Sequence, residues 1–145
     1  MIIRDATIDD FPDLYRMGIA FAAAAEMPEV DPDTFYRSVE MLISDGILKV
    51  AVNSTICGGA GALVFPHYWN EKEIVAQELF WWVDENARKS SAAIRLLSEM
   101  ESEAREKGAK SLIMITLDKL TPEVLERLYI RRGYRPQERA FIKEL

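Results

Sequence analysis

The 145-residue chain contains one cysteine and one histidine, no long apolar run and no excess of basic residues. Cys57 alone cannot form an internal disulfide, and one cysteine with one histidine supplies too few soft ligands for a zinc-type metal site. No window approaches the roughly 18 to 20 apolar residues of a membrane span, and residues 1–5 lack the features of a signal peptide. The formal net charge of −6 argues against nucleic-acid binding through a general basic surface. We therefore expect a cytoplasmic protein with no metal and no membrane or nucleic-acid partner.

The chain carries a continuous series of helix and strand patterns, without a linker, repeat or low-complexity segment. Its length is that of one domain, so we expect a single domain over residues 1–145. Apolar spacing predicts strands at residues 2–4, 47–52, 56–65, 74–83, 111–116 and 139–143, and helices at 7–25, 32–44, 91–107 and 122–132. The expected class is α/β, with the order βααβββαβαβ and antiparallel pairing of the three consecutive strands at 47–52, 56–65 and 74–83.

Helix boundaries in this series coincide with capping residues. Thr7 precedes two aspartates that favour the first turn of a helix, and Asp31 precedes a proline that suits the first helical position. Gly108 follows the helix expected to end at residue 107, as a C-terminal cap would. These local signals predict where three helix ends lie.

The segment after the strand at 74–83 has small and basic residues at the start of a helix. Backbone N–H groups at a helix start are unpaired and lie at the positive end of the helix dipole, so they attract anions. Ser90 and Ser91 are small enough for close approach, and Arg88 and Lys89 add positive charge. The sequence therefore predicts an anion site, with an ordinary serine N-cap as the alternative interpretation.

Two separated motifs resemble the GNAT family of N-acetyltransferases. The first runs from Val83 to Ala93 and is similar to the family's strand end, acidic turn and Arg/Gln-x-x-Gly-x-Gly/Ala signature. The second, Leu128 to Tyr134, matches the pattern Leu/Phe-Tyr-x-x-x-Gly-Phe/Tyr at every fixed position. The pairing of Pro66-His67-Tyr68-Trp69 with Ala92-Ala93 resembles a subgroup common in bacteriophage and prophage genomes.

The resemblance implies the GNAT fold, with a mostly antiparallel sheet flanked by helices, and direct acetyl transfer from acetyl-CoA to a primary amine. By position, Glu78 corresponds to the general base and Tyr129 to the general acid, and a phenol with a pKa near 10 can protonate a thiolate at neutral pH. The backbone around Trp82 and Val83 would pair with the pantetheine arm, and the Val83 N–H would polarise the thioester carbonyl. The implied pyrophosphate cradle consists of Arg88, Lys89, Ser90, Ser91, Ala92 and Ala93.

The sequence also departs from the family pattern. Ser91 stands at the signature glycine and Lys89 where glycine is frequent, so side chains occupy two positions of close backbone approach. These departures support the alternative of a catalytically degenerate, phage-encoded binding or structural protein. Glu78 read alone fits a solvated or ion-paired strand residue, and His67 fits a surface or packing histidine better than a base.

The acceptor site is the least diagnostic part of the chain. The resemblance places it in residues 17–36 and 66–70, where Glu26, Glu29, Asp31 and Asp33 cluster. An acidic region favours a cationic amine, such as a polyamine, an aminoglycoside-like molecule or a protein lysine, although such charges also serve solubility. A homodimer is common in the family and is a second expected partner.

Overall fold

The computed structural model describes residues 1–145 and divides them into two compact units, Met1–Ile115 and Thr116–Leu145. The single domain expected over the whole chain stays a prediction. No helix is long and apolar enough to cross a membrane.

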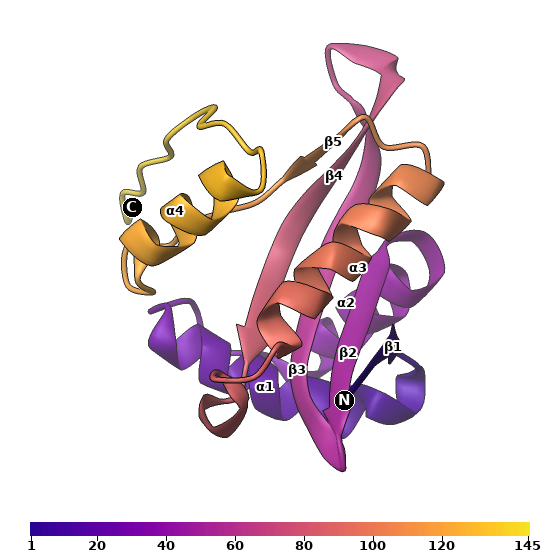
Figure 1. Cartoon of the computed structure of the whole chain (residues 1–145), viewed down its shortest axis with the longest axis vertical. Coiled ribbons are helices and arrows are strands. Elements are labelled where there is room, and N and C mark those ends of the chain that lie inside the picture. Colours follow the sequence, from indigo (N-terminus) through magenta and orange to yellow (C-terminus); the bar gives the residue numbers. More distant parts are fainter. The chain divides into compact units, whose positions relative to one another are not determined.

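The first unit combines five strands with three α-helices (Figure 1). Its strands are β1 (Ile2–Asp5), β2 (Ile47–Asn53), β3 (Thr55–His67), β4 (Asn70–Val83) and β5 (Ser111–Ile113). Its α-helices are α1 (Phe11–Ala24), α2 (Pro32–Asp45) and α3 (Ala92–Glu106), and two short 3-10 helices are η1 (Ile8–Asp10) and η2 (Glu85–Ala87).

The strands form one sheet in the order β1-β2-β3-β4-β5. The first three pairings are antiparallel and the last, between β4 and β5, is parallel. The predicted α/β class with a mostly antiparallel sheet is therefore confirmed. The β3–β4 hairpin is longer than predicted, because the turn predicted over residues 66–72 is confined to Tyr68 and Trp69, and strand pairing reaches His67 and Asn70 on either side of it.

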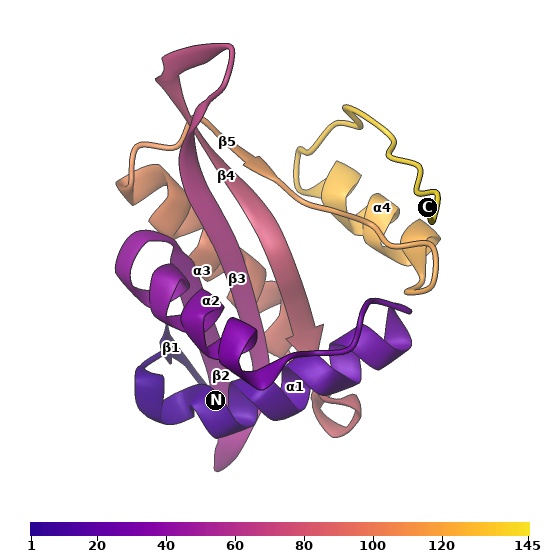
Figure 2. The ribbon, with the colours of Figure 1, turned by 180° about the vertical axis from the view of Figure 1, so that it is seen from behind.

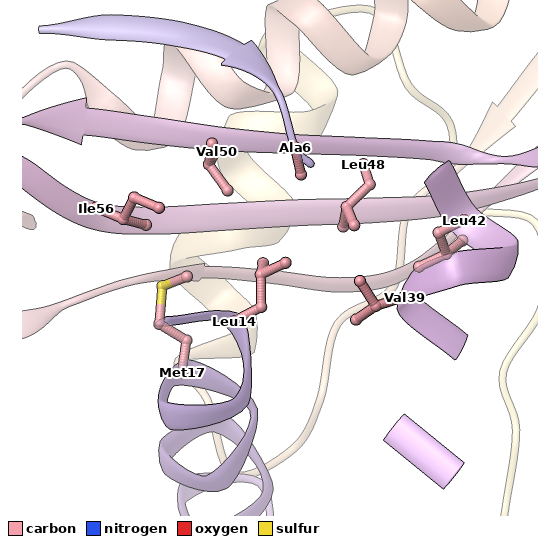
Figure 3. Packing of buried hydrophobic residues seen from close by; sticks show 8 residues of the cluster. All are labelled: Ala6, Leu14, Met17, Val39, Leu42, Leu48, Val50 and Ile56. Carbon is pink, nitrogen blue, oxygen red and sulfur yellow. The ribbon is translucent and has the colours of Figure 1, made fainter. Parts of the chain in front are cut away.

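Helices cover both faces of this sheet, with α3 on one face and α1 and α2 on the other (Figures 1 and 2). Close packing explains the glycine at position 61 of β3. A Cβ on Gly61 would lie 2.7 Å from Cε1 of Phe80. On the α1 and α2 face, a buried apolar cluster joins the helices to the sheet (Figure 3); its members are Ala6, Leu14, Met17, Val39, Leu42, Leu48, Val50 and Ile56.

One irregularity interrupts the β3–β4 pairing next to that glycine. Gly61 pairs with Phe80 and Ala62 pairs with Glu78, so Leu79 is an extra residue on β4. Such a bulge bends the strand and changes the direction of the side chains beyond it.

The predicted helix caps in the first unit are confirmed. The Asp31 carboxylate accepts a 2.8 Å hydrogen bond from the Thr34 N–H at the start of α2. At the first helix, the Asp10 carboxylate accepts a 2.8 Å bond from the Thr7 N–H. Gly108 follows α3 with a φ of +84°, a conformation that glycine adopts without a Cβ penalty.

The second unit contains one helix, α4 (Pro122–Arg131), and no strand. The prediction of a strand at residues 139–143 was wrong. This strand was the last β of the expected order βααβββαβαβ. Phe141 and Ile142 are 86% and 95% exposed, and the Arg139 guanidinium lies 5.5 Å from the Phe141 ring centroid. The apolar pattern was present, but a strand needs a neighbouring strand to satisfy its backbone, and this segment has none.

Candidate functional site

The C-terminal half of β4 has strand pairing on one side only. β5 pairs with β4 over Val75–Gln77, whereas β3 remains paired along β4 as far as Val83. The Asp84 N–H donates to the Cys57 carbonyl across this pairing at 2.9 Å. Because backbone groups alternate in direction along a strand, the Val83 N–H points away from β3, toward the open edge. A donor at this place can bind a ligand carbonyl or amide that lies along the strand.

Glu78 begins this half of β4 and is buried, with 7% of its surface exposed. Burial raises the pKa of its carboxyl group to about 7, against a smaller lowering by the backbone N–H of Ile115. That N–H donates a 2.9 Å hydrogen bond to Oε2. Glu78 has no ion-pair partner, so the alternative of a salt-bridged or solvated strand residue is wrong. A carboxyl group with a pKa near 7 can accept a proton at neutral pH and release it again.

The turn that follows β4 brings the predicted anion-binding residues together before α3. Ser90 organises its backbone: the hydroxyl donates to the Ala87 carbonyl at 2.6 Å and accepts from the Ala92 N–H at 3.2 Å. Ser91 occupies the N-cap position without a side-chain capping bond. The alternative of an ordinary serine N-cap is therefore not confirmed, because the exposed Ser91 side chain makes no capping bond; the Ser90 hydroxyl, one residue earlier, bonds the Ala92 N–H instead.

Arg88 is exposed, and the chain holds its guanidinium in a defined position. Its Nε donates to the Val83 carbonyl at 3.1 Å, and the guanidinium carbon lies 4.8 Å from the Trp82 ring centroid. Nε is the only nitrogen of the group that bonds within the protein, so the two terminal nitrogens can serve a ligand. Lys89 is exposed as well and has no acidic partner.

These residues fit a phosphate group in part. The early N–H groups of α3 have no partners inside the helix, and Ala93 belongs to this first turn. The Ala92 N–H is already bonded to Ser90, and the Ala92 side chain is fully buried. The donors that remain for an anion are therefore Arg88, Lys89, the Ser91 hydroxyl and the Ala93 end of the helix.

The second motif is explained by local geometry inside the second unit. Tyr129, 7% exposed, lies in the last turns of α4. Gly133 has a φ of +92°, and the N–H groups of Gly133 and Tyr134 bond back to the carbonyls of Ile130 and Tyr129 at 3.1 and 2.9 Å. This is the Schellman ending of a helix, and it places the Tyr134 ring 5.4 Å from the Tyr129 ring. The spacing Tyr-x-x-x-Gly-Tyr thus fixes how the Tyr129 ring is packed.

His67 lies at the end of the β3–β4 hairpin. Its Nδ1 accepts a 3.0 Å bond from the Trp69 N–H, and its ring stacks on Tyr68 at 4.7 Å between centroids. Tyr68 and Trp69 are each 80% exposed. His67 lies where β4 starts, whereas Arg88 to Ser91 follow the other end of β4; His67 is a turn-forming residue in this structure.

The sequence reasoning gave no role to Arg16 or to Asp84. The structure pairs them through two hydrogen bonds of 3.1 and 2.9 Å, although they are 68 residues apart. Trp82 also donates from Nε1 to the Asp84 carboxylate at 3.2 Å. Asp84 stood inside the predicted motif, but nothing in the sequence indicated its partner on α1.

An α/β unit with an open strand edge, a buried carboxyl group and a basic helix start has the features of a class of proteins that can accept an extended, anionic ligand. Comparison with protein families narrows this class: the model of the acetyltransferase (GNAT) family matches residues 12–135. The chain belongs to the GNAT family, which supports acetyl transfer as its general chemistry, so the predicted family is confirmed. No curated protein sequence matches the chain.

Solved structures share the fold at low sequence identity. An acetyltransferase from Trypanosoma brucei is 18% identical, with 99% of each chain covered and a TM-score of 0.77. An aminoglycoside acetyltransferase from an uncultured soil metagenomic sample is 20% identical, with 99% of this chain and 95% of that chain covered and a TM-score of 0.75. The ribosomal-protein-alanine N-acetyltransferase of Brucella melitensis is 16% identical over 100% of both chains, with a TM-score of 0.75. These likenesses support the fold.

Proposed function

We propose that the protein is an N-acetyltransferase that moves an acetyl group from acetyl-CoA directly to a primary amine. The observation that carries this proposal is the buried Glu78, whose pKa of about 7 suits a general base, on the strand with the open edge. Family membership supplies the reaction class, and the basic turn after β4 supplies a place for the coenzyme's phosphates.

Each proposed role follows from the chemistry of the residue. Glu78 takes a proton from the ammonium group of the acceptor, directly or through a water molecule, so that the nitrogen lone pair can form the new amide bond. The Val83 N–H stabilises the negative charge that develops on the carbonyl oxygen. As the carbon–sulfur bond breaks, Tyr129 gives its phenolic proton to the departing thiolate, a role proposed from its motif. As the tetrahedral intermediate collapses, the nitrogen loses its second proton to solvent and the Tyr129 phenol is restored from solvent, so the acetyl group ends on the amine and the coenzyme leaves as a free thiol.

Coenzyme binding is assigned to the β4 edge and the following turn. Trp82 and Val83 provide strand backbone for the pantetheine arm, and Arg88 and Lys89 provide the charge for the pyrophosphate. Ser91 has a hydroxyl where the family has glycine. The hydroxyl is a hydrogen-bond donor, but the side chain leaves less room for the pyrophosphate to approach the backbone. We expect the coenzyme to bind in the cytoplasm without any metal.

The proposed acceptor is a cationic amine bound near the segment between α1 and α2. Glu26, Glu29, Asp31 and Asp33 lie in or beside that segment. Two of the structural neighbours act on amines of very different size by their printed names, an aminoglycoside acetyltransferase and a ribosomal-protein-alanine N-acetyltransferase. A panel that contains aminoglycosides, polyamines, lysine peptides and peptides with a free N-terminal alanine covers this range. A homodimer remains part of the proposal.

The test is acetyl transfer to that panel, with thiol release and the mass of the acetylated amine measured together. Wild-type protein should release thiol and acetylated amine in equal amounts, and Glu78→Gln should reduce both by about a hundredfold. If the wild type binds acetyl-CoA but neither product forms with any amine, the degenerate binding or structural protein, the second candidate, replaces this proposal. The side chains of Ser91 and Lys89 and the bonded Ala92 N–H are the features that favour that second candidate.

A further inference from the structure

The ion pair between Arg16 on α1 and Asp84 after β4 is the first link of a contact series that ends at Arg88. Arg16 Nη1 and Nη2 donate to the two oxygens of Asp84, and Nη2 also donates to the Ile56 carbonyl at 3.3 Å. A two-pronged guanidinium–carboxylate pair fixes orientation better than a single contact does. The pair therefore sets the position of the carboxylate against α1.

The same carboxylate orients the indole of Trp82. Oδ1 of Asp84 accepts the Trp82 Nε1–H at 3.2 Å, and the Phe21 ring meets the indole edge-on at 6.1 Å between centroids. The Arg88 guanidinium lies over the indole ring, and its Nε is tied to the Val83 carbonyl. Each residue thus limits the orientation of the next, from α1 to the exposed end of Arg88.

Arg16 is not suited to bind a phosphate group directly. Both of its terminal nitrogens are bonded to Asp84, whose negative charge balances its own, and the first cause of the raised pKa of Arg16 is that hydrogen bonding. Arg88 differs because its terminal nitrogens have no protein partner. The two arginines therefore serve one site in different ways.

We propose that Arg16 is a positioning residue for coenzyme binding: through Asp84 and Trp82 it holds the Arg88 guanidinium ready for the pyrophosphate. This inference rests on the proposed function, because it needs the turn after β4 to bind coenzyme A. It also means that α1, the helix that leads into the proposed acceptor segment, is tied to the coenzyme site by a defined ion pair.

The experiment measures the dissociation constant of coenzyme A by calorimetry in wild-type protein and in Arg16→Gln, Arg16→Lys and Arg88→Gln. Arg16→Gln should weaken binding about three- to tenfold. Arg16→Lys keeps the positive charge but cannot form the two-pronged pair with Asp84. It should therefore weaken coenzyme A binding nearly as much. In Arg88→Gln protein, adding Arg16→Gln should change the dissociation constant less than twofold, since the residue through which it acts is gone.

Arg4 provides the matched control. It also forms a two-pronged pair, with Asp10 at 2.7 and 2.8 Å, and its side chain is 41% exposed against 48% for Arg16. Arg4→Gln should cost similar thermal stability and leave coenzyme A affinity unchanged. The inference fails if Arg16→Gln binds as wild type does, if Arg4→Gln weakens binding equally, or if the Arg16→Gln loss persists in full without Arg88. A wild-type protein that does not bind coenzyme A would overturn the proposed function and this inference together.

Discussion

The backbone N–H of Ile115 donates a hydrogen bond to Oε2 of the buried Glu78, across the place where β5 has ended and β4 continues. A peptide N–H stabilises the ionised carboxylate, whereas burial favours the neutral acid, and burial is the larger effect. The result is a carboxyl group that changes protonation state near neutral pH.

The rate of acetyl transfer should follow the ionisation of Glu78. Since only the carboxylate accepts a proton, kcat/KM should rise with pH and level off above an inflection near 7. Glu78→Gln should remove this inflection and lower kcat/KM by about a hundredfold. A pH profile from 5 to 9 for both proteins checks this, and an unchanged inflection in Glu78→Gln would assign it to another group.

The contribution of Glu78 to protein stability should fall as the pH rises, whereas kcat/KM should rise. Its pKa is raised on folding, so its contribution to stability is fully present below its usual value of 4.5 and is lost as the pH rises through about 7. The loss at pH 8 amounts to at most about 3 kcal/mol. Glu78→Gln, which keeps an acceptor for the Ile115 N–H, should therefore be more stable than wild type at pH 8 and equal at pH 4. Urea unfolding at both pH values measures the difference; equal stability at pH 8 would contradict it.

Tyr129→Phe tests the proposed general acid. Loss of the phenol should lower kcat by about 10- to 100-fold and leave acetyl-CoA affinity within twofold, because the ring and its packing remain. Tyr134→Phe is the matched control, as it removes the hydroxyl from the neighbouring ring and should retain most of the activity. Steady-state kinetics at saturating acetyl-CoA separates the two variants. Equal activity of Tyr129→Phe and wild type would remove Tyr129 from the mechanism.

Gly133 should be required for the orientation of Tyr129. Its φ of +92° disfavours any residue with a Cβ, so Gly133→Ala should cost about 1 to 2 kcal/mol and loosen the Tyr129–Tyr134 packing. Gly108, at the end of α3, has a φ of +84°, and a Cβ at either glycine meets no atom within 4 Å. Gly108→Ala should therefore lose similar stability but retain activity, whereas Gly133→Ala should lose both. Thermal unfolding and activity of the two variants provide the comparison.

Local signals in the sequence predicted much of the fold. Asp31, Thr7 and Gly108 mark helix ends through contacts within a few residues, which sequence spacing reveals directly. The spacing in the second motif likewise encodes a helix ending whose hydrogen bonds span only five residues. Where the physical cause was local, the prediction and the structure agree.

Contacts between residues far apart in the chain could not be predicted from the sequence. The pairing of Arg16 with Asp84 spans 68 residues, and the hydrogen bond from the Ile115 N–H to Glu78 spans 37. Neither leaves a pattern in the chain. Residues 139–143 show the reverse error, since a strand-like pattern was present without the neighbouring strand that a strand requires.

Binding of acetyl-CoA at the turn after β4 is tested most directly by titrating the protein with acetyl-CoA while following thermal unfolding. A ligand at about a hundred times its dissociation constant adds roughly 2.7 kcal/mol of stability, which is a shift of several degrees for a domain near this size. We predict a saturable rise of that size in wild-type protein, with a much smaller one in Ser91→Trp, where a large side chain meets the approaching phosphates. No shift at millimolar acetyl-CoA would show that the turn is only a helix start and would contradict the proposed acetyltransferase.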